Sequence, residues 1–161
     1  MSLYNRNKAI AYAHKWAYGR NPKYYNFDSI GGDCTNFISQ CIYEGCNVMN
    51  YNKYGWYYKN GNNKSPSWTG VEFLYNFLTS NNGIGPYAKP ASIDSLEAGD
   101  IIQLSANGNT FSHTLLVVDA GSIPSYNNIL IACHTIDRDY YPLSNYIFKK
   151  IRFIKILGCR L

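Results

Sequence analysis

The sequence lacks long apolar runs, paired metal-binding cysteines and clustered positive charge, and each absence excludes a class of protein. No segment reaches the roughly 18 consecutive apolar residues of a transmembrane helix, so no membrane span is expected. No CxxC pair occurs, so the usual signature of zinc clusters and thioredoxin-like redox sites is missing, and we expect no metal or cofactor. The net charge of +5 is spread along the chain without a zinc-finger, RRM or helix-turn-helix signature, so no nucleic-acid partner is expected.

The 161 residues also lack internal repeats and low-complexity linkers, so we expect one domain over residues 1–161, acting as a monomer. The start, Met1-Ser2-Leu3, lacks the basic and apolar regions of a signal peptide. Two localisations stay open. Either the protein is cytoplasmic, or the sequence is the mature part of a chain that is secreted or associated with the cell wall. In the second case the positive surplus would help the protein to approach an anionic wall.

Aromatic residues are abundant, with 16 Tyr, 7 Phe and 3 Trp. They either replace Leu and Val in a small core or line an exposed groove, because Tyr and Trp suit sugar and peptide ligands. Trp56 lies in a polar loop and is the better candidate for contact with substrate. Trp68 opens an amphipathic helix, which slightly favours the core over the groove.

The order of the predicted elements indicates an α+β fold. Apolar residues at helical spacing predict helices over residues 5–18, 34–44 and 68–79. Runs rich in Ile, Val and Leu predict strands over residues 100–104, 114–119, 129–133 and 149–157. Helices that precede strands in this way indicate N-terminal helices packed on a mostly antiparallel C-terminal sheet.

Among the five cysteines, Cys34 has the sequence context of a nucleophile. It follows Gly31-Gly32-Asp33 into an amphipathic helix, so its thiol lies at the positive end of a helix dipole, which favours the thiolate. Its backbone N–H is a candidate oxyanion donor. Cys41 and Cys159 lie in apolar runs and are interpreted as core residues, and a disulfide from Cys46 stays open.

Two of the three histidines are candidates for the base. His14 is interpreted as a structural helix residue, whereas His113 opens one predicted strand and His134 closes the next. If the strands form a hairpin, a register that pairs His113 with His134 centres its turn inside the connecting loop, and the two side chains share a face. His113 is then the general base, and His134 orients it by a hydrogen bond. Asp137 is the alternative third residue, and a metal site that includes Cys133 is a less favoured alternative.

Two polar residues beside Cys34 are further candidates for substrate binding. Asp33 either reads a substrate amine or caps the helix, and the cap is favoured. Asn36 either bonds within the first helical turn or faces the cleft.

Five segments in order resemble the putative amidase domain family of Gram-positive bacteria, which is related to the NlpC/P60 and CHAP hydrolases. Residues 32–40 resemble the nucleophile segment, and Ser112-His113-Thr114 resembles the histidine segment. The remaining segments are Trp56-Tyr57-Tyr58 with Ser67-Trp68, Ala98-Gly99-Asp100-Ile101-Ile102, and His134-Thr135 with Asp137-Arg138 and Pro142-Leu143.

The resemblance implies a papain-like, NlpC/P60-like fold and a thiol-dependent amide hydrolase with Cys34 as nucleophile, His113 as base and His134 as third residue. It also implies a bacterial cell-wall substrate, either the peptidoglycan stem peptide or the muramoyl–alanine amide. Two alternatives are a catalytically inactive module that binds the wall through its aromatic residues, and a secreted effector or toxin that hydrolyses protein amides.

Overall fold

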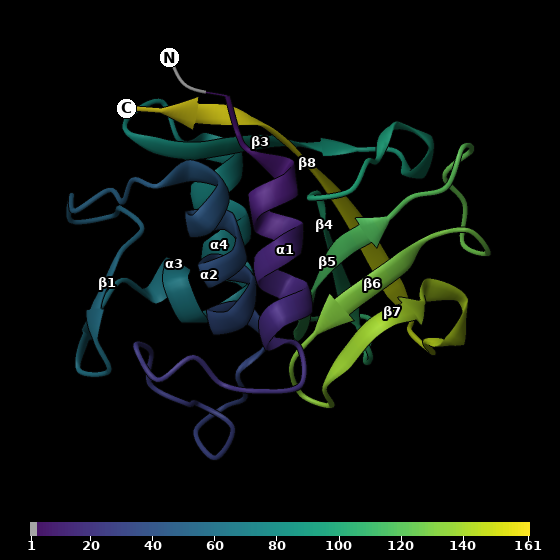
Figure 1. Cartoon of the computed structure of the whole chain (residues 1–161), viewed down its shortest axis with the longest axis horizontal. Coiled ribbons are helices and arrows are strands. Elements are labelled where there is room, and N and C mark those ends of the chain that lie inside the picture. The colour runs from purple at the N-terminus through teal and green to yellow at the C-terminus, as the bar shows by residue number, and fades with distance from the viewer. Residues whose placement is uncertain (1–2) are drawn as a thin grey trace.

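The structure is a computed structural model that describes residues 3–161. The prediction about a signal peptide concerned the start Met1-Ser2-Leu3, and Met1 and Ser2 lie outside the described residues. Figure 1 shows helices gathered on one side of a twisted antiparallel sheet, with the segment that leads into α1 and the C-terminus at the same edge of the molecule. None of the helices within residues 3–161 has the length and apolar character needed to cross a membrane.

The described helices are α1 (Arg6–Trp16), α2 (Cys34–Cys46), α3 (Pro66–Thr69) and α4 (Val71–Ser80), with short 3-10 turns at Ile93–Ser95 and Leu143–Asn145. A two-stranded ribbon is formed by β1 (Tyr58–Asn60) and β2 (Asn63–Lys64). The main sheet contains β3 (Gly85–Ala91), β4 (Ile101–Ser105), β5 (His113–Asp119), β6 (Leu130–Cys133), β7 (Arg138–Pro142) and β8 (Lys150–Arg160). Its strands run in the order β3-β8-β4-β5-β6-β7, and every neighbouring pair is antiparallel. The predicted α+β class is therefore confirmed.

The helices form largely where the apolar spacing predicts them. Asn5 caps α1, because its side chain accepts a hydrogen bond from the Lys8 N–H at 3.0 Å. The predicted third helix is divided into α3 and α4 by Gly70, whose extended backbone interrupts the helical hydrogen bonding. The central helix α2 lies between α1, α3 and the sheet, and nearly all of its residues are buried.

Two edge strands were missed by the sequence prediction. β3 carries Pro86 and Pro90, and proline is tolerated in a sheet only at an edge, where its missing N–H leaves no ladder bond unmade. β7 forms the opposite edge, and its sequence Arg-Asp-Tyr-Tyr-Pro has no run of aliphatic residues. Both strands form because they pair with a neighbouring strand, more than because of their own amino-acid composition.

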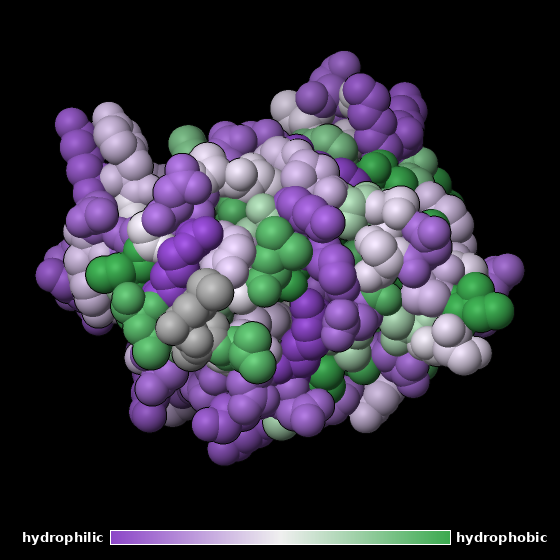
Figure 2. Space-filling view, turned by 90° about the horizontal axis from the view of Figure 1, so that it is seen from above, coloured by the Kyte–Doolittle hydropathy of each residue, from purple (hydrophilic) through white to green (hydrophobic). Residues whose placement is uncertain are grey.

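The sheet separates two apolar clusters. Leu116 and Ala132 pack with the helices, whereas Leu115 and Cys133 pack on the other face under the turns that follow β3 and β7. Adjacent residues of one strand thus belong to different layers, as the alternation of a β-strand requires. The face seen in Figure 2 mixes hydrophilic and hydrophobic side chains without one broad apolar area.

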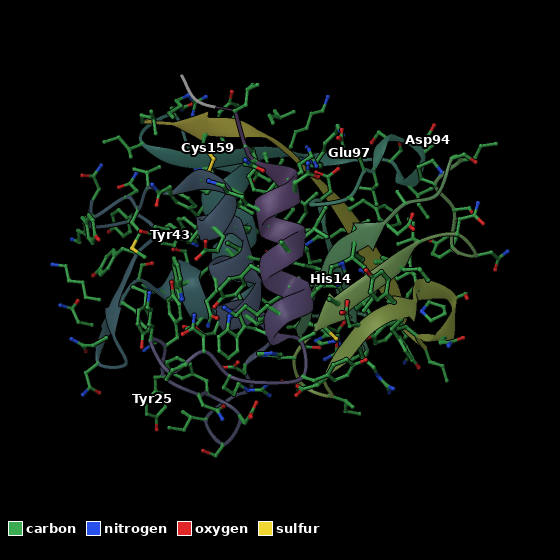
Figure 3. The ribbon with its side chains drawn as sticks, viewed as in Figure 1. His14, Tyr25, Tyr43, Asp94, Glu97 and Cys159 are labelled. Atoms are coloured by element: carbon green, nitrogen blue, oxygen red, sulfur yellow. A yellow bond between two sulfur atoms is a disulfide. The ribbon has the colours of Figure 1, made fainter. Side chains whose placement is uncertain are left out.

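A disulfide joins Cys46 at the end of α2 to Cys159 near the end of β8, beside the label of Cys159 in Figure 3. Cys159 is buried, as predicted, but as half of this bond rather than as a free core thiol. Figure 3 also shows His14 on α1 next to the sheet. Its ring lies 2.8 Å from the Asp139 carboxylate and stacks on Tyr140, which gives it the structural role that the sequence predicted.

Candidate active site

The turn before α2 depends on two glycines. Gly31 and Gly32 have φ angles of +82° and +94°, in the left-handed region that other residues rarely adopt. A Cβ atom on Gly32 would also come within 3.3 Å of the Thr135 hydroxyl oxygen. These glycines let the chain pass close to Thr135 and begin α2 at Cys34, in the first helical turn as predicted.

The Cys34 thiol lies where β5 separates from β6. Regular pairing of the two strands begins at Leu116 with Ala132, so Thr114 lies beyond it. The Thr35 and Thr114 hydroxyls are 2.9 Å apart and join the first turn of α2 to the start of β5. Burial raises the pKa of the Cys34 thiol above its ordinary value, and hydrogen bonds from the Thr114 backbone and from Thr35 oppose this. With 7% of its surface exposed, Cys34 is a protonated thiol at rest.

His113 opens β5 immediately before Thr114. Its ring packs beside Tyr146, with the ring centroids 5.9 Å apart. Within residues 3–161, neither ring nitrogen of His113 has a hydrogen-bond partner, and burial alone lowers its pKa to about 4. The imidazole is therefore neutral at pH 7, with both nitrogens available to accept or donate a proton.

The predicted pairing of His113 with His134 is wrong by one residue. The observed register pairs Leu116 with Ala132 and, continued to the strand ends, would set His113 opposite Thr135. A shift of one residue moves a side chain to the other face of a sheet. His134 accordingly stacks on Phe37 of α2, with ring centroids 3.8 Å apart, on the helical side.

His134 is occupied by other partners, so the prediction that it orients His113 is also wrong. Its Nδ1 lies 2.6 Å from an Asp33 carboxylate oxygen, and its Nε2 lies 2.8 Å from the Trp16 carbonyl oxygen. Nε2 is also 3.1 Å from the Arg20 guanidinium. Both His134 and Asp33 are 1% exposed, so this histidine acts as an internal connector between α1, α2 and the end of β6.

Asp33 neither caps α2 through its side chain nor faces the solvent. Its carboxylate accepts hydrogen bonds from the Phe27 N–H and the Asn36 amide, both at 2.9 Å, in addition to its contact with His134. Burial raises the pKa of this carboxyl group, but the bonds from His134, Phe27 and Asn36 together hold the pKa below its ordinary value. Asp33 is an ionised anchor for the turn that precedes Cys34, and the predicted amine contact and helix cap are both wrong.

Three other predicted substrate contacts are buried. Asn36 is 1% exposed and bridges the Tyr25 carbonyl oxygen and the Trp68 indole N–H. Trp56 and Trp68 are each 0% exposed, and their rings pack together with centroids 4.7 Å apart. The assignment of these three residues to a groove is therefore wrong, whereas the alternatives are confirmed for Asn36, which bonds to Asp33 at the first turn of α2, and for Trp68, which lies in the core. Trp56 is buried because the loop that looks polar in sequence folds back, so that Trp56 bonds to Ser39 of α2.

Asp137, the alternative third residue, is also engaged elsewhere. Its two carboxylate oxygens accept hydrogen bonds from Arg20 at 2.9 and 3.0 Å. Arg20 binds Asp28 as well, and it lies 3.6 Å from Asp33. Sequence analysis missed Arg20 because its partners are far away in the chain, and an isolated arginine after a helix carries no local signal.

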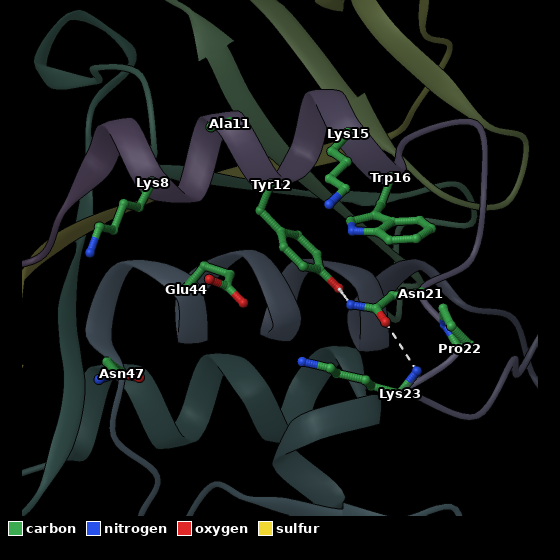
Figure 4. A pocket seen from close by; sticks show the side chains of 10 residues that line it. All are labelled: Lys8, Ala11, Tyr12, Lys15, Trp16, Asn21, Pro22, Lys23, Glu44 and Asn47. Carbon is green, nitrogen blue, oxygen red and sulfur yellow. Dashed lines mark hydrogen bonds between the residues drawn. The ribbon is translucent and has the colours of Figure 1, made fainter.

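A hollow of about 690 Å³ is lined by residues of α1, α2 and the segment after α1, and Figure 4 shows how their side chains lie. Lys8, Lys15 and Lys23 surround it with Glu44, and Tyr12 accepts a hydrogen bond from Asn21 at its centre. Neither Cys34 nor His113 lines this hollow, and no cysteine or serine lines it. Cys34 and His113 lie instead at the starts of α2 and β5, which the Thr35–Thr114 contact joins.

Comparison with known proteins identifies relatives of the chain. The family model described as "Putative amidase domain" matches residues 3–157. The "Uncharacterized protein YhbB" of Bacillus subtilis (strain 168) is 35% identical over 130 residues, which are 77% of this chain and 40% of that protein. The chain thus spans well under two thirds of the length of this relative. No solved structure matches.

Proposed function

Since the chain belongs to the putative amidase domain family, we propose that it is a thiol-dependent amide hydrolase with Cys34 as nucleophile and His113 as base. One arrangement carries the proposal. The Cys34 thiol, at the first turn of a buried helix, lies against the Thr114 backbone. The residue before Thr114 is His113, a neutral histidine whose two ring nitrogens have no partner within residues 3–161. A neutral histidine near a thiol is the kind of base that activates it when the two come within hydrogen-bond reach.

The reaction follows from these groups. His113 takes the thiol proton as the sulfur of Cys34 attacks the amide carbonyl carbon. The carbon–nitrogen bond breaks when His113 passes this proton to the leaving amine, and a thioester remains on Cys34. Water then attacks the thioester, its proton passes through His113 to the departing sulfur, and the carboxylic acid leaves. As the first residue of α2, Cys34 has a backbone N–H without an intrahelical partner, which suits it to stabilise the oxyanion.

The resting pair has its proton on sulfur, because burial raises the pKa of the thiol and lowers the pKa of the imidazole. Substrate binding must therefore promote proton transfer from the Cys34 sulfur to His113. A carbonyl carbon placed next to the sulfur does this, because the sulfur forms a bond to the carbon as it loses its proton. Because no residue within 3–161 bonds to the His113 ring, the proposed catalytic group is a Cys34–His113 dyad, in which the His113 ring contacts Tyr146.

The proposal extends to a papain-like relationship with the NlpC/P60 and CHAP hydrolases and to bacterial peptidoglycan as the substrate. A helix that begins at the nucleophile and packs on an antiparallel sheet that carries the base supports the first part. The positive charge supports approach to an anionic wall. The Cys46–Cys159 disulfide supports a location outside the cytoplasm, since such bonds persist in oxidising compartments. The alternative of an inactive wall-binding module loses two of its proposed contacts, because Trp56 and Trp68 are buried.

The test is hydrolysis of purified peptidoglycan, followed by release of new amino groups and mass analysis of the fragments. Cys34→Ala should lower turnover by at least about 10³-fold, because removal of a nucleophile leaves only binding and oxyanion effects. Cys41→Ala is the matched control, because Cys41 is a second free, buried thiol on the same helix. Equal activity of Cys34→Ala and the wild type would refute the nucleophile assignment.

A further inference from the structure

Arg138 differs from the other arginines of the chain. The sequence contains five arginines, and Arg6, Arg20, Arg152 and Arg160 each donate hydrogen bonds to side-chain or backbone oxygens. Within residues 3–161, the Arg138 guanidinium donates none. Its Nε is buried without a partner, although the side chain as a whole is only partly buried. A buried donor left unpaired costs stability, so a native protein that keeps one needs a reason for it.

The acidic residues beside Arg138 in the sequence cannot satisfy it. Asp137 is bound by Arg20, and Asp139 is bound by His14. The guanidinium instead lies over the Tyr141 ring, with its central carbon 4.1 Å from the ring centroid. This stacking holds the planar group in place and leaves its edge, which carries the N–H donors, without a protein acceptor.

Arg138 lies on the same face of the sheet as the proposed dyad's base. Arg138 is the register partner of Cys133, so the two side chains point to the same face of the sheet. Cys133 belongs to the apolar cluster on the face away from the helices, and Leu104 belongs to the same cluster. His113 is the register partner of Leu104 and shares that face. Arg138 and His113 are then linked through two tyrosines, since Tyr141 packs edge-on against Tyr146 at 5.4 Å and Tyr146 packs beside His113.

Side-chain contacts place Arg138 near the base of the proposed dyad. The Cys133 thiol lies 3.1 Å from the Tyr146 hydroxyl. Burial raises the pKa of Cys133 to about 12, and the hydrogen bond with Tyr146 and the charge of Arg138 oppose this rise. Cys133, Tyr146 and Arg138 are thus neighbours of His113 on one face of the sheet.

We propose that Arg138 binds a carboxylate of the substrate next to the amide that Cys34 attacks, so that the preferred substrates are acylated peptides with a free carboxylate near the scissile bond. The planar guanidinium and a carboxylate match each other in two parallel hydrogen bonds, and partial burial strengthens this pair. Tyr141 and Tyr146 form an aromatic wall beside it. The inference rests on the proposed amide hydrolysis and specifies its substrate.

The experiment measures binding without chemistry, in the Cys34→Ala protein. The probes are N-acetyl-alanyl-alanine with a free carboxylate and the same compound as its C-terminal amide, each in the L and D series. Isothermal titration calorimetry should give a dissociation constant at least about tenfold lower for one free acid than for its amide, since charge-assisted hydrogen bonds differ by about that factor.

Variants of Arg138 assign this preference. Arg138→Gln should abolish the preference for the free acid, and Arg138→Lys should keep part of it, because lysine retains the charge but not the paired donors. Arg160→Gln is the matched control, since Arg160 also lies over a tyrosine ring but donates to the Asn81 carbonyl oxygen far from Cys34. It should leave the preference unchanged.

The outcomes separate this inference from the proposed function. No preference for the free acid, no binding of either compound, or the same preference in Arg138→Gln each overturns the role of Arg138, whether or not the wild type hydrolyses amides. Circular dichroism melting gives a second readout. A purely structural Arg138 predicts a large loss of melting temperature in Arg138→Gln with the ligand preference intact, and that result also overturns the proposal.

Discussion

Two polar clusters differ in how fully their hydrogen-bonding groups are used. In the first, at the start of α2, Asp33, His134 and Arg20 bond to one another and to the backbone. In the second, His113 and Arg138 are linked through Tyr146 and Tyr141, and the His113 ring and the Arg138 Nε have no hydrogen-bond partner in the part of the chain that the structure describes. We call these the closed cluster and the open cluster.

The difference between the two clusters shows which histidine is bonded within the protein and which has free ring nitrogens in the described residues. A buried polar network whose members are all satisfied holds its surroundings in one arrangement. Groups without partners are poorly suited to that purpose, and they are the ones available to a substrate. Two histidines near consecutive strand ends, which look alike in sequence, thus have different surroundings: His134 is bonded on both ring nitrogens, and His113 is the one that the proposed function uses as its base.

The largest expected effect comes from replacement of His113 in the open cluster. His113→Asn should lower turnover on amide substrates by about 10²–10⁴-fold, because it removes the general base and leaves the thiol protonated. The unfolding free energy at pH 7 should change little, since the ring makes no hydrogen bond within residues 3–161. Steady-state kinetics with urea unfolding checks both statements. Near-normal turnover in this variant would remove His113 from the mechanism.

The next largest effect is expected in the closed cluster, where a substitution should lower the free energy of unfolding more than it lowers turnover. His134→Ala leaves the Asp33 carboxylate buried without its histidine partner, which should lower the unfolding free energy by about 3 kcal/mol. Turnover of the folded fraction should fall by less than about tenfold. A loss of turnover as large as that of His113→Asn, with unchanged stability, would restore His134 to the catalytic group.

The smallest effect concerns the response to acid. Burial lowers the pKa of His113 to about 4, whereas the unfolded chain has an ordinary histidine pKa near 6.5. The unfolded state therefore binds a proton first as the pH falls. The stabilisation from neutral His113 is complete above about pH 6.5 and is lost progressively toward pH 4.

His113→Asn should make this acid loss smaller, by about 1–2 kcal/mol after allowance for the partial exposure of the ring. The measurement is the urea midpoint of both proteins at pH 7, 5.5 and 4.5. Parallel pH curves for the wild type and His113→Asn would show that His113 is not held neutral by burial.

Local sequence signals predicted much of the fold. Three of the helices and the four aliphatic strands lie close to their predicted ranges, because apolar spacing and capping act within a few residues. The edge strands β3 and β7 were not predicted, since their prolines and polar residues are accepted only by virtue of their place in the sheet. The buried state of Trp56 and Asn36 was also not predicted, because it depends on contacts with α2 and with residues far along the chain.

The sequence by itself determined the position of Cys34 in the first turn of a helix and of His113 at the start of a strand. Glycine φ preferences and hydrophobic periodicity act locally, so both positions can be read without the fold. Only the tertiary structure decided that His134 joins Asp33 and Arg20, and that the Arg138 Nε has no hydrogen-bond partner within residues 3–161. The physical reason is the register of β5 with β6, in which a shift of one residue exchanges the two faces of the sheet.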